Sequence, residues 1–163
     1  MELTTIEKKE NEKFLRQKAV DFDFSKFTKK EINELIKAMR IMMKLNDGVG
    51  LAANQAGLNT RVFVAQVEDK FYAIFNPKII HESEEMAAED EGCLSVPGFY
   101  GPVPRSTKIT ITAYDKNNKP VKIKAWGLLA RVFQHEVDHL NGKLFIDRAS
   151  EMHKIEPKND LKK

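Results

Sequence analysis

The spacing of apolar residues predicts an amphipathic helix in the first third of the chain. The segment Thr28-Lys-Lys-Glu31 has the pattern of a helix-capping box. Apolar residues then recur at helical spacing, at Ile32, Leu35, Ile36, Met39, Met42 and Met43. We expect this helix to run to Asn46 and to stop at Asp47-Gly48, because glycine tolerates the left-handed conformation that commonly ends helices. The stretch from Gly48 to Gly57 is expected to be a glycine- and alanine-rich connection.

A second helix is predicted from about Gly127 to Leu140, with Asn141-Gly142 as its stop. Its apolar side includes Leu129, Val132, Phe133 and Leu140, and Glu136 lies on the same side. This side should face a core, so any polar group on it needs an explanation.

Alternating apolar and polar residues predict two antiparallel strand pairs. The first pair is Arg61 to Val67 with Phe71 to Ile80, and the second is Lys108 to Tyr114 with Val121 to Trp126. The segment from Pro97 to Pro104 is rich in proline and glycine, and we expect an irregular loop that cannot form a regular ladder. The predicted architecture is α+β, with antiparallel strands packed around or beside the second helix and the first helix covering another face.

Length and composition limit the number of domains and the kinds of partner that we expect. A chain of 163 residues with 42% hydrophobic content fits one compact domain over residues 1–163, with 149–163 as a polar tail that frays or forms a short helix. The 27 basic and 24 acidic residues are spread along the whole sequence, so no basic stripe indicates nucleic-acid binding. No apolar run resembles a signal peptide or approaches a membrane span, so we expect a cytoplasmic protein with no membrane contact.

The segment His135-Glu136-Val137-Asp138-His139 carries the strongest chemical signal. Two histidines four residues apart point the same way from a helix and can bind one metal ion together. Glu136 lies about one helical step from His135, where it can exchange a proton with a water held in the site without being a ligand. The pattern indicates a metal-dependent hydrolase.

A catalytic site of this kind needs a third protein ligand. The metzincin class is disfavoured, because its third histidine would stand where this chain has Phe145. Glu151 and Glu156 are downstream candidates of the thermolysin type, although they sit in the polar tail. Cys93, the only cysteine, is the better candidate, since a thiolate is a strong ligand and the adjacent glycine allows close backbone approach; its other reading is a buried apolar cysteine.

Three segments together resemble the peptide deformylase family. They are Gly48-Val-Gly-Leu-Ala-Ala-Asn-Gln55, Glu91-Gly-Cys-Leu-Ser95 and Gln134-His-Glu-Val-Asp-His-Leu140, in the family's order and spacing. The resemblance extends from about Asn11 to Arg148 and includes Phe14-Leu15-Arg16. It implies removal of the N-formyl group from the methionine of a newly made polypeptide.

The resemblance also implies roles for individual residues. Cys93, His135 and His139 would hold the metal, Glu136 would activate water, and Gln55 with the backbone N–H of Leu94 would stabilise the oxyanion. Substrate-binding positions would be Val49, Gly50, Leu128, Val132 and Arg105. We expect Arg105 to pair with Glu91 and so fix the loop that carries Cys93, while Asp138 either orients a ligand or lies on the surface.

Two features of the chain depart from the pattern of the family. Arg131 stands beside the expected pocket, where an apolar residue would be simpler. Some family members dock on the ribosome through a longer C-terminal helix, and the fifteen residues after Arg148 argue against that contact here. We expect a monomer.

The sequence leaves more than one possibility for the metal ion and for the function. One cysteine with two histidines suggests zinc from ligand type alone, whereas the resemblance implies Fe²⁺, with Zn²⁺, Ni²⁺ or Co²⁺ as substitutes. A peptidase with a downstream Glu ligand is the second functional reading, and a non-catalytic metal- or ribosome-binding module is the third. The presence of both Glu136 and Gln55 argues against the third.

Overall fold

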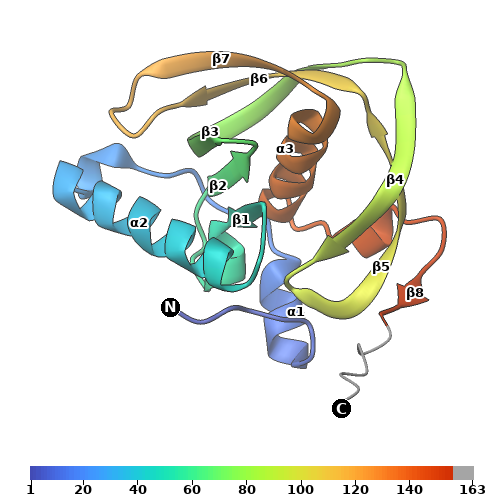
Figure 1. The fold of residues 1–163 in the computed structure, drawn as a ribbon. Helices are drawn as coiled ribbons and strands as arrows, with labels where there is room; N and C mark the ends of the chain where they lie inside the picture. The colour runs from blue at the N-terminus through green and yellow to red at the C-terminus, as the bar shows by residue number, and fades with distance from the viewer. Residues whose placement is uncertain (156–163) are drawn as a thin grey trace, which may run out of the picture.

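A computed structural model describes residues 1–155 of the chain. In this part the protein is α+β, with three α-helices and two antiparallel sheets (Figure 1). The helices are α1 (Lys9–Leu15), α2 (Lys29–Leu45) and α3 (Gly127–Leu140), and short 3₁₀ turns cover Phe24–Lys26, Ala53–Ala56 and Phe145–Asp147. The coarse α+β prediction is confirmed, while α1 was not predicted from the sequence.

The larger sheet has five antiparallel strands in the order β1-β2-β3-β6-β7. Their bounds are β1 (Gly50–Ala52), β2 (Val62–Val67), β3 (Lys70–Glu82), β6 (Lys108–Tyr114) and β7 (Pro120–Trp126). Both predicted strand pairs are therefore present, with ends shifted by up to two residues. The expected connection after α2 holds β1 and the 3₁₀ turn Ala53–Ala56, because its small side chains allow a strand to pack closely against β2.

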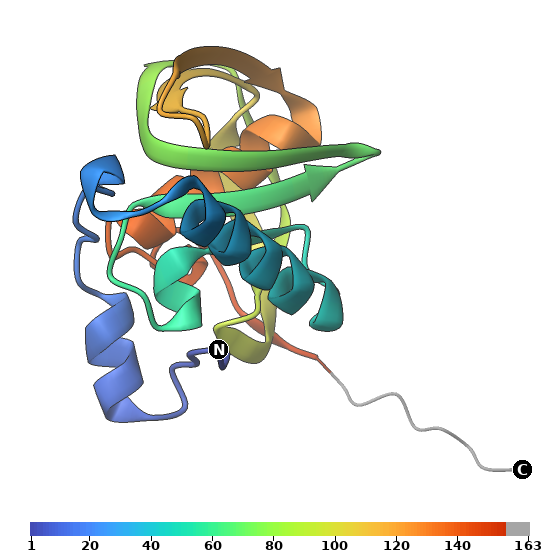
Figure 2. The same ribbon diagram turned by 90° about the vertical axis from the view of Figure 1, so that its left-hand side faces the viewer.

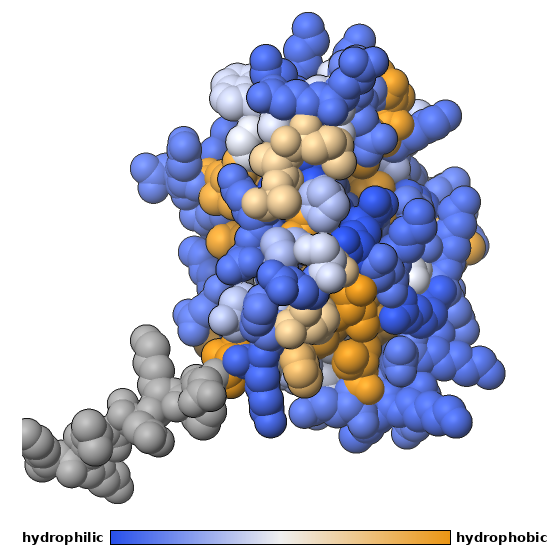
Figure 3. Space-filling view, turned by 90° about the vertical axis from the view of Figure 1, so that its right-hand side faces the viewer, coloured by the Kyte–Doolittle hydropathy of each residue, from blue (hydrophilic) through white to orange (hydrophobic). Residues whose placement is uncertain are grey.

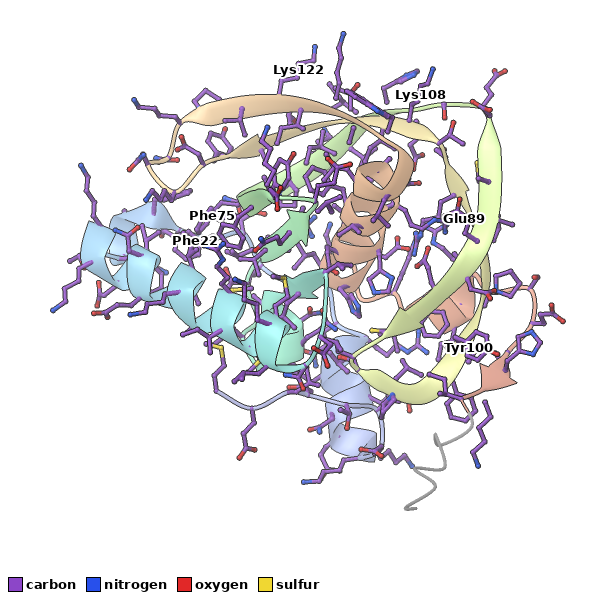
Figure 4. The ribbon with its side chains drawn as sticks, in the orientation of Figure 1. Phe22, Phe75, Glu89, Tyr100, Lys108 and Lys122 are labelled. Carbon is purple, nitrogen blue, oxygen red and sulfur yellow. The ribbon has the colours of Figure 1, made fainter. Side chains whose placement is uncertain are left out.

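Helix α2 packs on β1, β2 and the start of β3 in this sheet (Figure 2). The capping box is confirmed: Thr28 Oγ1 accepts from the Glu31 N–H at 3.2 Å, and Glu31 Oε2 accepts from the Thr28 N–H at 2.7 Å. The predicted apolar stripe packs on Val62, Val64 and Phe75, the last of which contacts Phe22 edge-on (Figure 4).

The end of α2 differs from the prediction. Asp47, with φ 54°, takes the left-handed conformation that was expected of Gly48. At Gly48 an added Cβ would lie 2.8 Å from Leu94 Cδ1, so the end of the Leu94 side chain would have to shift.

The expected loop over residues 97–104 is wrong, because this segment forms a regular ladder. Strand β4 (Met86–Cys93) pairs with β5 (Val96–Ser106) from Met86↔Ser106 to Gly92↔Tyr100. Pro102 is tolerated because its carbonyl faces away from β4. On that outer side of β5 the carbonyl accepts a hydrogen bond from the Ser150 N–H. Pro104, two residues on, faces the same outer edge, so neither proline removes a donor from the ladder.

The C-terminal segment adds a third strand to this smaller sheet. β8 (His153–Lys154) pairs with Phe99 and Tyr100 of β5, whereas the sequence predicted fraying or a short helix after Arg148. Figure 3 shows this side of the molecule, where hydrophobic side chains lie among many hydrophilic ones. The rest of the predicted tail, 156–163, lies outside the described residues.

Helix α3 lies between the two sheets (Figure 1) and contacts β1, β2, β6 and β7 of one sheet and β5 of the other. Its bounds match the prediction, and Gly142 has the expected positive φ of 74°. Phe133 packs edge-on against Phe63 and Tyr72 and anchors the helix on the larger sheet. Among the described helices, none is long and apolar enough to cross a bilayer.

We expect Thr28→Ala to lower the free energy of unfolding by about 1 kcal/mol, because it removes the side-chain acceptor at the N-cap of α2. Thr28→Ser keeps that acceptor and is the matched control. Urea unfolding followed by circular dichroism measures both. An alanine variant as stable as the serine variant would show that the capping box contributes nothing.

Candidate metal centre

Three potential metal ligands from separate segments meet at one point. Cys93 ends β4, whereas His135 and His139 project from one side of α3. The Cys93 Sγ lies 3.2 Å from His139 Nε2, which lies 3.1 Å from His135 Nε2, and all three atoms are within 4.8 Å of one another. Within residues 1–155, this is the cluster of His, Cys, Asp and Glu side chains with donor atoms close enough to hold one ion.

These separations fit a shared metal ion. Bonds of about 2.0–2.3 Å in tetrahedral geometry place neighbouring donor atoms roughly 3.3–3.6 Å apart. Burial lowers the pKa of His139 well below its ordinary value, so its ring is neutral, as metal binding requires. The donor set therefore suits a divalent ion with one thiolate and two imidazole ligands.

Glu91 fixes the orientation of His135. Its Oε1 lies 2.8 Å from His135 Nδ1, which leaves Nε2 turned toward Cys93 and His139. Burial alone would raise the pKa of Glu91, but hydrogen bonds from His135 and Arg105 lower it to about 2, so the carboxylate is charged at neutral pH. The same strand thus supplies one candidate ligand at Cys93 and holds a second in place through Glu91.

Two buried arginines neutralise this carboxylate. Arg105 donates to both Glu91 oxygens at 2.6 and 2.9 Å, which confirms the expected pairing. Arg131 donates to Glu91 Oε2 at 2.6 Å and to the carbonyls of Val103 and Ala87 at 2.8 Å. Arg131 therefore stands beside the pocket because it ties α3 to β4 and β5.

Asp138 belongs to the same network and does not orient a histidine. It is 6% exposed, so it is not a surface charge, and it accepts from Arg105 at 2.8 Å and from Arg148 at 2.7 Å. The sequence left its role open between ligand orientation and surface charge. The structure shows a buried link from α3 to Arg105.

Glu136 lies beside the three donor atoms in an enclosed position. The residue is 3% exposed, and burial raises the pKa of its carboxyl to about 7. Within the described residues its Oε2 has no hydrogen-bond partner. Gly50 makes room for it, because a Cβ there would lie 2.4 Å from Glu136 Oε1.

Gln55 is oriented by its own backbone surroundings. Its Oε1 accepts from the Ala52 N–H at 2.9 Å, which leaves the amide Nε2 as donor toward the site. Nε2 lies 3.6 Å from Cys93 Sγ and donates to Ser95 Oγ at 3.2 Å.

A cavity of about 310 Å³ opens beside these groups. Predicted residues on its wall are Val49, Gly50, Gln55, Cys93, Leu94, Leu128, Val132, His135 and Glu136. Arg105, predicted among the substrate-binding residues, does not line the cavity, because its guanidinium is fully engaged behind the site. Val49 and Leu128 are about half exposed, so a ligand entering the cavity would cover them.

Of the alternative third ligands, Glu151 does not reach this site. Glu151 is exposed, pairs with His153 at 3.4 Å and does not line the cavity. Glu156 lies outside the described residues. The sequence predicted that Glu91 pairs with Arg105, but it did not predict that Glu91 orients His135. That contact joins β4 to α3 and therefore depends on the fold.

Comparison with known proteins identifies the same family throughout. The family profile described as polypeptide deformylase matches residues 4–155. A peptide deformylase from Natranaerobius thermophilus is 44% identical over 126 residues, which is 77% of this chain and 81% of that protein.

Solved structures of such proteins share the fold. Peptide deformylase from Thermotoga maritima superposes with a TM-score of 0.83 at 34% identity, covering 92% of this chain and 97% of that one. A class I type b peptide deformylase from Acinetobacter baumannii, with Met-Ala-Ser bound, gives a TM-score of 0.84 at 30% identity, covering 91% and 97%.

We expect Cys93→Ala to lose the bound ion after anaerobic loading, because two imidazoles alone form an incomplete set. Elemental analysis of the desalted protein measures the ion content. His153→Ala, which removes an exposed histidine outside the cluster, is the matched control and should bind as the unchanged protein does. Full occupancy in the alanine variant would mean that Cys93 is not a ligand.

Proposed function

The chain belongs to the peptide deformylase family, and we propose that Cys93, His135 and His139 hold its catalytic metal ion. The protein is a metal-dependent hydrolase that removes the N-formyl group from newly synthesised polypeptides. The assignment of the ligands is carried by one observation: three donor atoms from β4 and α3 converge within 4.8 Å.

We propose that Glu136 moves the proton in this reaction. A divalent ion held by Cys93, His135 and His139 would supply Lewis acidity and would lower the pKa of a water toward the neutral range. Glu136 accepts a proton from that water as its oxygen attacks the formyl carbon, and it returns a proton to the departing amine nitrogen as the C–N bond breaks. Without a bound ion, burial raises the pKa of this carboxyl to about 7, which favours its taking up a proton.

The oxyanion that forms at the formyl carbon needs donors aimed at its oxygen. We assign this role to Gln55 Nε2 and the backbone N–H of Leu94, both on the cavity wall beside Cys93. The bond from Ala52 to Gln55 Oε1 supports the assignment, because it fixes which end of the amide faces the site. A neutral amide also stabilises negative charge without changing the net charge around the ion.

The cavity is proposed to take the methionine side chain. Val49, Gly50, Leu128 and Val132 give it an apolar wall, and 310 Å³ is at the lower end of the range typical for ligand pockets. A formylated N-terminus would then lie at the inner end, next to Glu136.

We propose Fe²⁺ as the native ion, with Zn²⁺, Ni²⁺ or Co²⁺ as substitutes, since a thiolate and two imidazoles suit all of these ions. In this reading α3 is the central metal-binding helix, α2 a covering helix and residues 1–163 one catalytic domain. We place the reaction in the cytoplasm, where formylated chains are made, and propose a monomer as the working unit.

We expect Glu136→Ala to reduce kcat/KM on formyl-Met-Ala-Ser by about 10²–10⁴-fold, because it removes the group that transfers protons. The assay uses iron-loaded protein under anaerobic conditions and follows formate release. Metal content should be unchanged, which separates loss of proton transfer from loss of the ion. Activity within a few fold of the unchanged protein would exclude Glu136 from the chemistry.

We also expect Gly50→Ala to lower kcat by more than about tenfold, because the added Cβ would displace Glu136 from the site. The unchanged protein is the reference, and the metal content of the variant should equal that of the reference. The same formate assay compares the two proteins. Equal activities would mean that Gly50 does not position Glu136.

A further inference from the structure

The outward face of β6 and β7 gathers basic residues that are dispersed in the sequence. Lys122, Lys124 and Trp126 alternate with Val121, Ile123 and Ala125, which belong to the core packed on α3. The period of two therefore turns the lysines and the indole away from α3. Figure 4 shows Lys122 and Lys108 pointing away from that helix.

Strand register places these side chains next to one another. Lys108 pairs with Trp126, Thr110 with Lys124, and Thr112 with Lys122. His81 of β3 pairs with Thr110 and extends this face by one strand. We call Lys108, Lys122, Lys124, Trp126 and His81 the outer basic face.

Within residues 1–155, no carboxylate lies within salt-bridge distance of the three lysines of the outer basic face. The nearby Glu82 pairs with Ile109, whose side chain points to the core, so Glu82 belongs to the opposite side. These charges are available to a polyanion.

An aromatic side chain completes the surface. Trp126 is 70% exposed, and a shallow hollow beside it is bounded by His81, Lys108, Thr110 and Lys124. Lysines along a sheet with an open aromatic ring match the needs of single-stranded nucleic acid, which offers phosphates to the cations and bases to stack on the ring. A lipid surface would need a broader apolar patch than one indole.

One end of this face is close in sequence to the cavity wall, because Trp126 stands two residues before Leu128.

We propose that the outer basic face binds single-stranded RNA, with Lys108, Lys122 and Lys124 on phosphates and a base stacked on Trp126. The uniform spread of charge along the sequence gave no sign of this, because the face is created by strand register. The proposal does not depend on the proposed metal ligands or on the proton transfer by Glu136.

The test measures fluorescence anisotropy of labelled oligoadenylate of about 16 nucleotides with the full chain. Binding at about 50 mM salt should weaken as salt rises, and Lys122→Glu with Lys124→Glu should reduce affinity at least about tenfold and flatten the salt slope by about 1.4. Lys13→Glu with Lys37→Glu, a matched charge change on exposed positions of α1 and α2, should leave affinity within about threefold.

Trp126→Ala separates stacking from charge. It should weaken binding to oligoadenylate at least about fivefold and leave binding to an abasic strand of the same length unchanged. All variants should keep the deformylation rate on formyl-Met-Ala-Ser, which shows that they are folded. The proposal is overturned if the unchanged protein does not bind RNA, if the control pair loses as much affinity, or if only anionic phosphatidylglycerol vesicles bind.

Discussion

Glu91 places one carboxylate between Arg105, Arg131 and His135, in a part of the protein that water barely reaches. An unpaired carboxylate there would be very costly, so the cations and the anion require one another. The arrangement joins β4, β5 and α3 through charged hydrogen bonds. Because Cys93 is two residues further along β4, the same contact that orients His135 also constrains the position of the Cys93 side chain.

The electrostatics of the site follow from this arrangement. Hydrogen bonds from His135 and Arg105 keep Glu91 ionised, and Glu91 in turn holds His135 through Nδ1. Glu136 Oε2 has no hydrogen-bond partner within the described residues, and burial raises the pKa of this carboxyl to about 7. The two glutamates therefore differ in their electrostatics: Glu91 is a fixed charge, and Glu136 is the group to which we assign the proton transfer. Glycine at position 50 preserves the space that the second one needs.

Local sequence patterns predicted much of the fold. The capping box, the apolar stripes of α2 and α3 and the alternation in β6 and β7 all have a strong signal within one element, and each element formed where it was expected. The β4–β5 ladder was not predicted, because β4 is acidic and β5 contains prolines. Pro102 and Pro104 are tolerated because they face the edge of β5 that does not pair with β4, and this orientation depends on the fold. Spacing within a helix likewise revealed His135, Glu136 and His139, but the approach of Glu91 to His135 depends on contacts between distant segments.

The affinity for the metal measures most directly whether Glu91 aligns His135 with the other proposed ligands. Competition with a chelator should show that Glu91→Gln binds the ion at least about tenfold more weakly, while circular dichroism shows the variant to be folded. Glu89→Gln is the matched control, since Glu89 pairs with Arg131 from the exposed side of the same strand and does not touch His135. A folded Glu91→Gln variant with the metal affinity of the unchanged protein would contradict the account.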